Sequence, residues 1–135
     1  MSCPVFFDSN VLVCTLVQDD PRQAVAKRLV DAGGVISVRS LDEFTTAARR
    51  KLRLSWPETT EALNALRALC PPPLPITLAI HETALRIAGR LGCRLYDSLI
   101  IASALEAGCA TLYSEDMQDG QVVEGALTIR DPFRP

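Results

Sequence analysis

Short apolar segments alternate with longer helical segments along most of this chain, and that alternation restricts its fold more than any other feature. Apolar runs at 4–7, 35–38, 109–114 and 126–130 have the length of buried strands, and a further strand is possible at 74–77. Strands separated by helices require right-handed crossovers, which place helices on both faces of a parallel sheet. The sequence therefore predicts a three-layer α/β/α sandwich with a central parallel sheet of four or five strands.

Capping residues and glycines mark where the helices between these strands begin and end. Ser, Asp and Asn favour helix starts because their side chains accept hydrogen bonds from the first free amides, and glycine favours helix ends. The predicted starts include Ser9 or Asn10, Asp20, Ser40 and Ser55, and the predicted ends include Gly33, Gly92 and Gly108. Prolines at 71–73 and 75 interrupt the chain without forming a linker, so we expect one domain spanning residues 1–135.

The composition is that of an ordinary globular protein. With 48% hydrophobic residues, and no apolar run of the roughly 18 residues that cross a bilayer, we expect a soluble, cytoplasmic protein. Five scattered cysteines without a C-x-x-C pair favour buried, reduced thiols over disulfides or a zinc site. A formal net charge of −2 means that any nucleic-acid partner would need local positive charge. The only histidine, His81, lies within a helical segment and is more typical of a helix surface than of a catalytic base.

Four acidic residues lie just after predicted strands or at the start of a predicted helix: Asp8, Glu43, Asp97 and Asp116. Each has a structural alternative. Asp8 can cap the helix that follows, and Glu43 has capping-box spacing from Ser40. Asp97 is favourable at the positive end of a helix dipole, and Asp116 can shape a turn.

The predicted sheet would bring these four acids to one place. Asp8, Glu43 and Asp116 each lie just beyond a strand end, which places them at the carboxyl edge of a parallel sheet. Asp97 begins the helix that leads back into the strand at 109–114, so it starts near the same edge. Open α/β sheets bind their ligands in the crevice at this edge. We therefore expect the four acids to form one site.

A cluster of carboxylates at this edge predicts a metal site. Carboxylates this close raise one another's pKa unless a cation compensates their charge. Oxygen ligands without histidine or thiolate suit Mg²⁺ or Mn²⁺. Such an ion lowers the pKa of a bound water and holds a phosphodiester in line for attack. The predicted chemistry is metal-assisted hydrolysis of a phosphodiester.

Several segments resemble the PIN-domain ribonucleases, and among them the VapC-type toxins of toxin–antitoxin pairs. These segments are FFDSNVLV, SVRSLDEF, LYDSLIIASALEAGCATLYSEDMQDG and TIRDPF, of which the third is the most specific. The resemblance implies a three-layer α/β/α fold and Mg²⁺- or Mn²⁺-dependent endoribonuclease activity. For a toxin, it also implies a homodimer and a small cognate antitoxin. That antitoxin would wrap the helices around residues 21–70 and mask the acidic crevice with an Arg or Lys.

The resemblance also implies a role for each residue that matches the family's motifs. The acids expected to hold the metal and to act in catalysis are Asp8, Glu43, Asp97 and Asp116. Asp119 matches an acid that only some members use, which makes it an auxiliary ligand. Asn10 and Ser114 match positions of polar support. Glu115 alternates with its neighbours and is expected to point to solvent.

A basic run lies about two turns beyond Glu43 on the same predicted helix and comprises Arg49, Arg50, Lys51 and Arg53. One interpretation is that these cations complement the helix dipole. The other is that they bind RNA phosphates beside the metal site, which would reconcile an acidic chain with a nucleic-acid substrate. Trp56 either stacks on a base or packs against the start of the next helix.

Two other functions are compatible with the sequence. The D-x-N pattern at 8–10 superficially resembles the D-x-D of aspartate-based phosphotransfer or phosphatase domains, although residues 109–120 contain no lysine to complete such a site. The second alternative is a catalytically silent PIN-like binding module that keeps the acidic site.

Overall fold

The computed structural model describes residues 4–70 and 72–134, and their centre is a four-stranded sheet in the order β1-β2-β4-β3. Three strands are parallel: β1 (Val5–Phe7), β2 (Thr111–Tyr113) and β4 (Leu127–Arg130). These confirm the strands predicted at 4–7, 109–114 and 126–130. The fourth, β3 (Val122–Val123), was not predicted, and it pairs antiparallel with β4. The sheet is therefore mostly, and not wholly, parallel.

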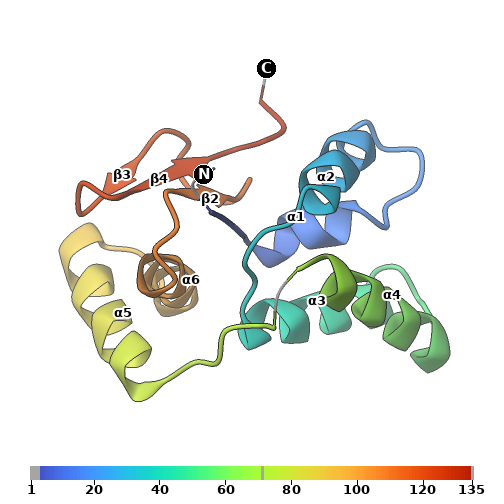
Figure 1. The fold of residues 1–135 in the computed structure, drawn as a ribbon, viewed down its shortest axis with the longest axis horizontal. Helices are drawn as coiled ribbons and strands as arrows, with labels where there is room; N and C mark the ends of the chain where they lie inside the picture. Colours follow the sequence, from blue (N-terminus) through green and yellow to red (C-terminus); the bar gives the residue numbers. More distant parts are fainter. Residues whose placement is uncertain (1–3, 71, 135) are drawn as a thin grey trace.

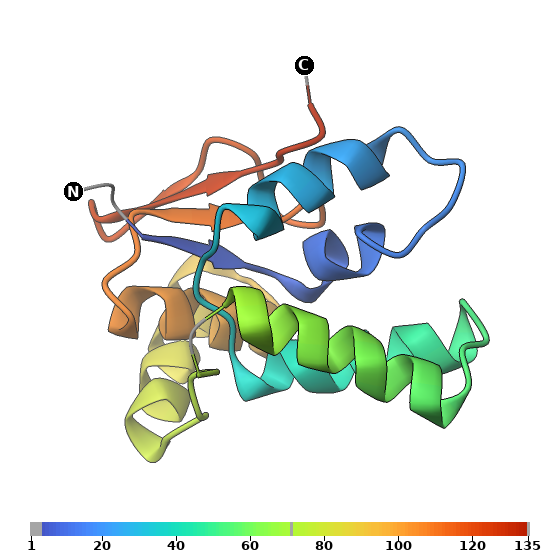
Figure 2. The same ribbon diagram turned by 45° about the vertical axis from the view of Figure 1, so that its right-hand side comes forward.

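Six helices surround this sheet in the part of the chain that the structure describes. They are α1 (Ser9–Cys14), α2 (Arg22–Asp31), α3 (Val38–Arg50), α4 (Trp56–Leu69), α5 (Leu78–Leu91) and α6 (Leu95–Glu106). Helices α5 and α6 group on one side of the strands, whereas α1 to α4 group on the other (Figures 1 and 2). None of these helices is both long enough and apolar enough to cross a membrane.

Two adjacent phenylalanines of β1 explain this arrangement. Successive side chains of a strand point to opposite faces of the sheet. Phe6, which is fully buried, belongs to the apolar cluster built by α5, α6 and the other strands. Phe7, also fully buried, belongs to the cluster built by α1 to α4. Since each face of β1 has its own apolar core, the chain forms the predicted α/β sandwich.

The segment predicted as a strand at 35–38 is shorter than expected. It forms only isolated parallel bridges, from Val35 to Phe6 and from Ser37 to Leu74. Helix α3 begins already at Val38, with Ser37 as its cap, because the Ser37 hydroxyl accepts a hydrogen bond from the Ser40 amide at 3.0 Å. The prediction that Ser40 opens this helix is wrong, as is the capping-box interpretation of the acid that follows it.

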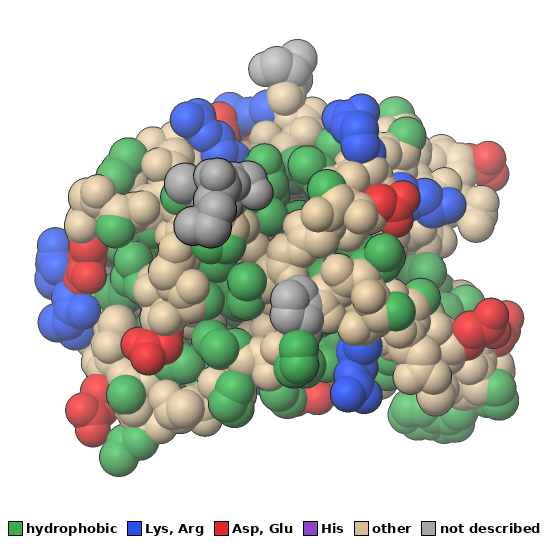
Figure 3. Space-filling view, viewed as in Figure 1, with side chains coloured by type: hydrophobic (Ala, Val, Ile, Leu, Met, Phe, Trp, Pro, Cys, Tyr) green, Lys and Arg blue, Asp and Glu red, His purple; other side chains and the backbone are tan. Residues whose placement is uncertain are grey.

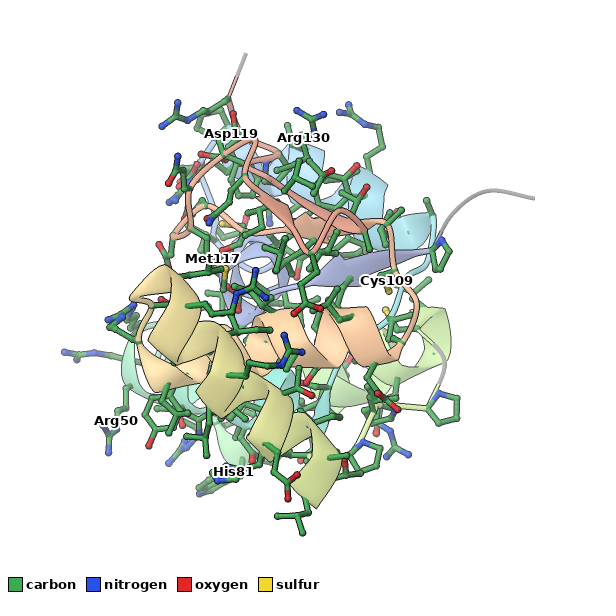
Figure 4. The ribbon with its side chains drawn as sticks, turned by 90° about the vertical axis from the view of Figure 1, so that its left-hand side faces the viewer. Arg50, His81, Cys109, Met117, Asp119 and Arg130 are labelled. Carbon is green, nitrogen blue, oxygen red and sulfur yellow. The ribbon has the colours of Figure 1, made fainter. Side chains whose placement is uncertain are left out.

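Other predictions about single residues are confirmed. Ser55 caps α4 in a capping box with Glu58, and Gly92 ends α5 in the left-handed conformation. His81 lies on the exposed face of α5, away from the sheet (Figure 4). The described cysteines are all free thiols, and of these only Cys93 is not buried. Cys3 lies outside the described residues.

Gly34 and Gly89 provide a matched test of the packing between α2 and β1. A Cβ at Gly34 would overlap the ring of Phe7, whereas a Cβ at Gly89, within α5, would meet open space. We expect Gly34→Ala to lower the free energy of unfolding by about 1–3 kcal/mol through overpacking. Gly89→Ala should raise it by about 0.5–1 kcal/mol through helix propensity. Equilibrium urea denaturation measures both, and a stable Gly34→Ala protein would contradict the packing.

Candidate functional site

The register of the parallel strands places Asp8 and Ser114 side by side at the carboxyl edge. Phe7 pairs with Tyr113, so the residues that follow them lie next to each other. The Asp8 amide donates to the Tyr113 carbonyl at 3.0 Å. The Ser114 hydroxyl donates to Asp8 Oδ2 at 2.8 Å, and both side chains are buried. The carboxylate at the end of β1 is therefore held in place by the end of β2.

The first turn of α1 connects this carboxylate to two others. The side-chain amide of Asn10 lies 3.3 Å from Asp8 Oδ2 and 3.1 Å from Asp116 Oδ2. The Ser9 hydroxyl donates to Glu43 Oε2 at 3.1 Å. Asp8 itself caps the helix, because its Oδ1 accepts from the Ser9 amide at 2.7 Å. Of the predicted caps Asp8, Ser9 and Asn10, the structure has Asp8, which leaves the side chains of Ser9 and Asn10 available to contact the other acids.

All four predicted acids line one cavity of about 210 Å³. Asp8 comes from the end of β1, Glu43 from the second turn of α3, Asp97 from the first turn of α6, and Asp116 from the loop after β2. The structure brings these residues together as the topology argument predicted. Asn10 and Ser114 contact Asp8 and Asp116 through the hydrogen bonds described above.

Two arginines that the sequence analysis missed line the same cavity. Arg39 Nε lies 3.3 Å from Glu43 Oε1, and its guanidinium stands over the ring of Tyr96, with 4.3 Å between the guanidinium carbon and the ring centroid. Arg94 Nη2 lies 3.3 Å from Asp97 Oδ2. Each arginine precedes its acid by one helical turn, a spacing that favours ion pairs and that the sequence displays openly.

Among the four acids of the cavity, Asp8 has a pKa that its surroundings shift strongly. Burial raises the pKa of its carboxyl from 3.8 to about 6. Hydrogen bonds from Ser114 and Ser9 lower the pKa, and the negative charges of Glu43 and Asp116 raise it. A cation beside these carboxylates would favour the ionised form of Asp8.

The donor atoms of the cavity suit a hard divalent cation, because they are carboxylate oxygens with hydroxyl and amide groups around them. As the side chains are placed, no three Asp, Glu, His or Cys residues among those described are close enough to hold one ion. Glu43 and Asp97 are paired with Arg39 and Arg94. The chemistry of the site therefore fits Mg²⁺ or Mn²⁺, and metal binding requires some of these side chains to move closer together.

Two other acids of the loop after β2 lie outside this cavity. Asp119 Oδ1 accepts the Asp131 amide at 2.8 Å, and Figure 4 shows it near Arg130, at the end of β4. Its predicted role as an auxiliary ligand stays a prediction, and the residue takes no part in the site described here. Glu115 pairs with Arg22 at 2.7 Å, which corrects the expectation that it points freely to solvent.

The PIN domain family model matches residues 5–119 of the chain. A toxin–antitoxin complex from Klebsiella pneumoniae is similar in structure, with a TM-score of 0.73 and 19% sequence identity over 97% of this chain and 99% of that chain. VapC20 of Mycobacterium tuberculosis, a sarcin–ricin-loop-cleaving toxin, has a TM-score of 0.65 and 20% identity over 80% of this chain and 86% of that chain. FitAcB from Neisseria gonorrhoeae has a TM-score of 0.68 and 15% identity over 97% of this chain and 99% of that chain. Identities this low establish a shared fold. No curated protein matches the sequence.

The raised pKa of Asp8 predicts how stability depends on pH without metal. Between pH 3.8 and about 6 the folded protein keeps a proton that the unfolded chain loses, so stability falls as pH rises through this window. The loss is on the order of 3 kcal/mol and is complete above the window. Asp8→Asn should flatten this dependence, as urea denaturation in EDTA at several pH values would show. Equal pH dependence in wild type and variant would contradict the burial of an ionisable group here.

Proposed function

The chain belongs to the PIN-domain family, and on that premise we propose that it is a divalent-metal-dependent endoribonuclease. The observation that carries the proposal is the single cavity lined by Asp8, Glu43, Asp97 and Asp116, which four separate elements supply. Two of the four also have a structural role, Asp8 as the cap of α1 and Asp97 in the first turn, at the positive end of the α6 dipole. Glu43 lies beyond the first turn of α3, so capping does not explain its presence at the cavity.

In this proposal Asp8, Glu43, Asp97 and Asp116 hold Mg²⁺ or Mn²⁺, whether as one ion or two. When bound, the metal lowers the pKa of a water molecule and neutralises charge on the phosphodiester. The chain's own contribution is to fix the acids. Ser114 and the Ser9 amide orient Asp8, and Asn10 orients Asp116. No histidine serves as a base in this scheme.

We further propose that the protein is the toxin of a toxin–antitoxin pair, acting on RNA in the cytoplasm. Its likeness to a toxin–antitoxin complex and to a toxin supports this role. The proposed antitoxin covers the helices around residues 21–70 and places an Arg or Lys in the acidic cavity, and the toxin is a homodimer. The ion pairs of Arg39 with Glu43 and of Arg94 with Asp97 support the placement of an antitoxin Arg or Lys in the cavity, since guanidinium groups already lie against its acids.

The same arginine pairs favour a second candidate, a PIN domain that binds without cleaving. Two of its four acids already have counter-ions from the chain itself, which reduces the charge repulsion in the cavity when no metal is bound. An aspartate-based phosphotransfer domain is less compatible with the geometry. Its nucleophile must reach a phosphodonor, whereas Asp8 is only 6% exposed and both of its oxygens accept hydrogen bonds.

RNA cleavage by two matched variants separates these candidates. Wild-type protein should cleave RNA with Mn²⁺ or Mg²⁺ and stop in EDTA. Asp97→Asn should cleave more slowly by on the order of 100-fold, because it removes one negative ligand from the first turn of α6. Glu106→Gln removes an exposed acid from the opposite end of the same helix and should cleave at the wild-type rate.

Circular dichroism and urea denaturation would establish that both variants are folded. A folded Asp97→Asn protein that cleaves as fast as wild type would refute the proposed site. A wild-type protein that binds metal but cleaves no RNA would favour the silent binding module.

A further inference from the structure

A groove of about 700 Å³ leads away from the acidic cavity along α3. Glu43 and Asp116 line both the cavity and the groove, so the two are continuous. Val13 and Leu52 contribute apolar parts of the groove wall. Its far end is lined by Arg50 and Lys51, seven and eight residues beyond Glu43. Seven residues of α-helix rise about 10 Å, so these cations lie within a short distance of the cavity along the helix axis.

The basic run at the end of α3 separates into two groups. Arg49 is engaged within the fold, because its Nη1 donates to the Leu54 carbonyl at 2.7 Å and its guanidinium stacks over Trp56 at 4.2 Å. Arg53 is exposed in the turn before α4, outside the residues that line the groove. Arg50 and Lys51 line it and form no ion pair with any residue in 4–70 or 72–134.

Trp56 is 61% exposed and is covered on one face by Arg49. Trp56 is the first residue of α4, and it lies outside the groove lining. The four basic residues that the sequence grouped together thus have different surroundings. Of these four residues only Arg50 and Lys51 line the groove, and Figure 4 shows Arg50 extending outward at the edge of the molecule.

We infer that Arg50 and Lys51 bind backbone phosphates of the RNA strand whose scissile phosphate enters the acidic cavity. This inference rests on the proposed ribonuclease function. Lysine and arginine bind nucleic acid mainly through phosphate contacts, which are independent of base sequence. Two cations about two helical turns from the acids can reach phosphates beside the cleaved one. Between Glu43 and these cations the groove is lined by both polar and apolar side chains of α3, among them Thr46 and Ala47.

The distribution of charge over the rest of the molecule bears on why RNA binding would use Arg50 and Lys51 at the far end of the groove. The chain has a net charge of −2, and the cavity itself carries four carboxylates that repel an RNA backbone. On the face drawn in Figure 3, Lys and Arg side chains are scattered around the rim instead of forming one patch. Arg22 also lines the groove, but it is paired with Asp20 and Glu115. Arg50 and Lys51 therefore supply the local positive charge that an acidic chain needs to bind RNA.

RNA binding by a protein with strongly reduced cleavage tests this inference. The parent is Asp97→Asn, and the probe is a fluorescent single-stranded oligouridylate whose anisotropy gives Kd at several salt concentrations. Adding Arg50→Gln and Lys51→Gln should raise Kd about tenfold at low salt. It should also reduce the slope of log K against log salt by about 1.4, the value for two lost phosphate contacts on a single strand.

The matched control adds Arg53→Gln and Arg67→Gln to the same parent. Both residues are exposed and lie outside the groove, and the pair removes the same two charges. The control should bind the probe as the parent does. Equal weakening in both pairs would overturn the inference, because it would show a general charge effect.

Other outcomes distinguish this inference from the proposed function. A parent that binds no oligouridylate would overturn the groove assignment. Unchanged RNA binding by the Arg50→Gln, Lys51→Gln protein would also overturn the groove assignment. This holds even if the same protein fails to bind an antitoxin, and the proposed catalysis would stand if wild type cleaves RNA with Mn²⁺. Conversely, a loss of binding confined to this pair would support the groove even if wild type cleaves nothing, and only the proposed catalysis would then be refuted.

Discussion

The hydrogen bond from the Ser114 hydroxyl to Asp8 is the contact on which the candidate site depends. It exists because β1 and β2 are parallel neighbours in a register that ends both strands at the same level. The same edge receives Asp97, because α6 runs back toward the start of β2. Glu43 arrives through α3, whose preceding segment bridges to β1. A slip of one residue between β1 and β2 would turn Asp8 away and separate the acids.

Charge repulsion within this site is balanced by the chain in two ways. Burial, with a smaller contribution from the charges of Glu43 and Asp116, raises the pKa of Asp8 to about 6, so this carboxyl is protonated below that pH. Glu43 and Asp97 are instead paired with Arg39, in the first turn of α3, and Arg94, the residue just before α6. A divalent cation would compensate all four acids together. In that account the arginines reduce the repulsion between the acids in the metal-free protein.

The sequence predicts the parts of this structure that follow from topology. The apolar runs predict where β1 and β2 end, and therefore that Asp8 and Asp116 follow strand ends. The parallel order of the strands then predicts that these two acids lie close together. The sequence does not predict the start of α3, because Ser37 and Ser40 are equally good caps and tertiary pairing of the preceding segment decides between them. Nor does it separate Arg49 from its neighbours, since that depends on the turn into α4. The spacing of residues in the sequence allows a long side chain several possible partners and does not determine which one it contacts in the fold.

The central claim is that the cavity lined by Asp8 and Asp97 is a divalent cation site. Calorimetric titration with Mn²⁺ tests it most directly, because it requires neither a known RNA target nor cleavage. The account predicts saturable Mn²⁺ binding to wild-type protein and a large loss of affinity in the folded Asp97→Asn variant. Absence of saturable binding, or equal affinity in wild type and variant, would contradict it.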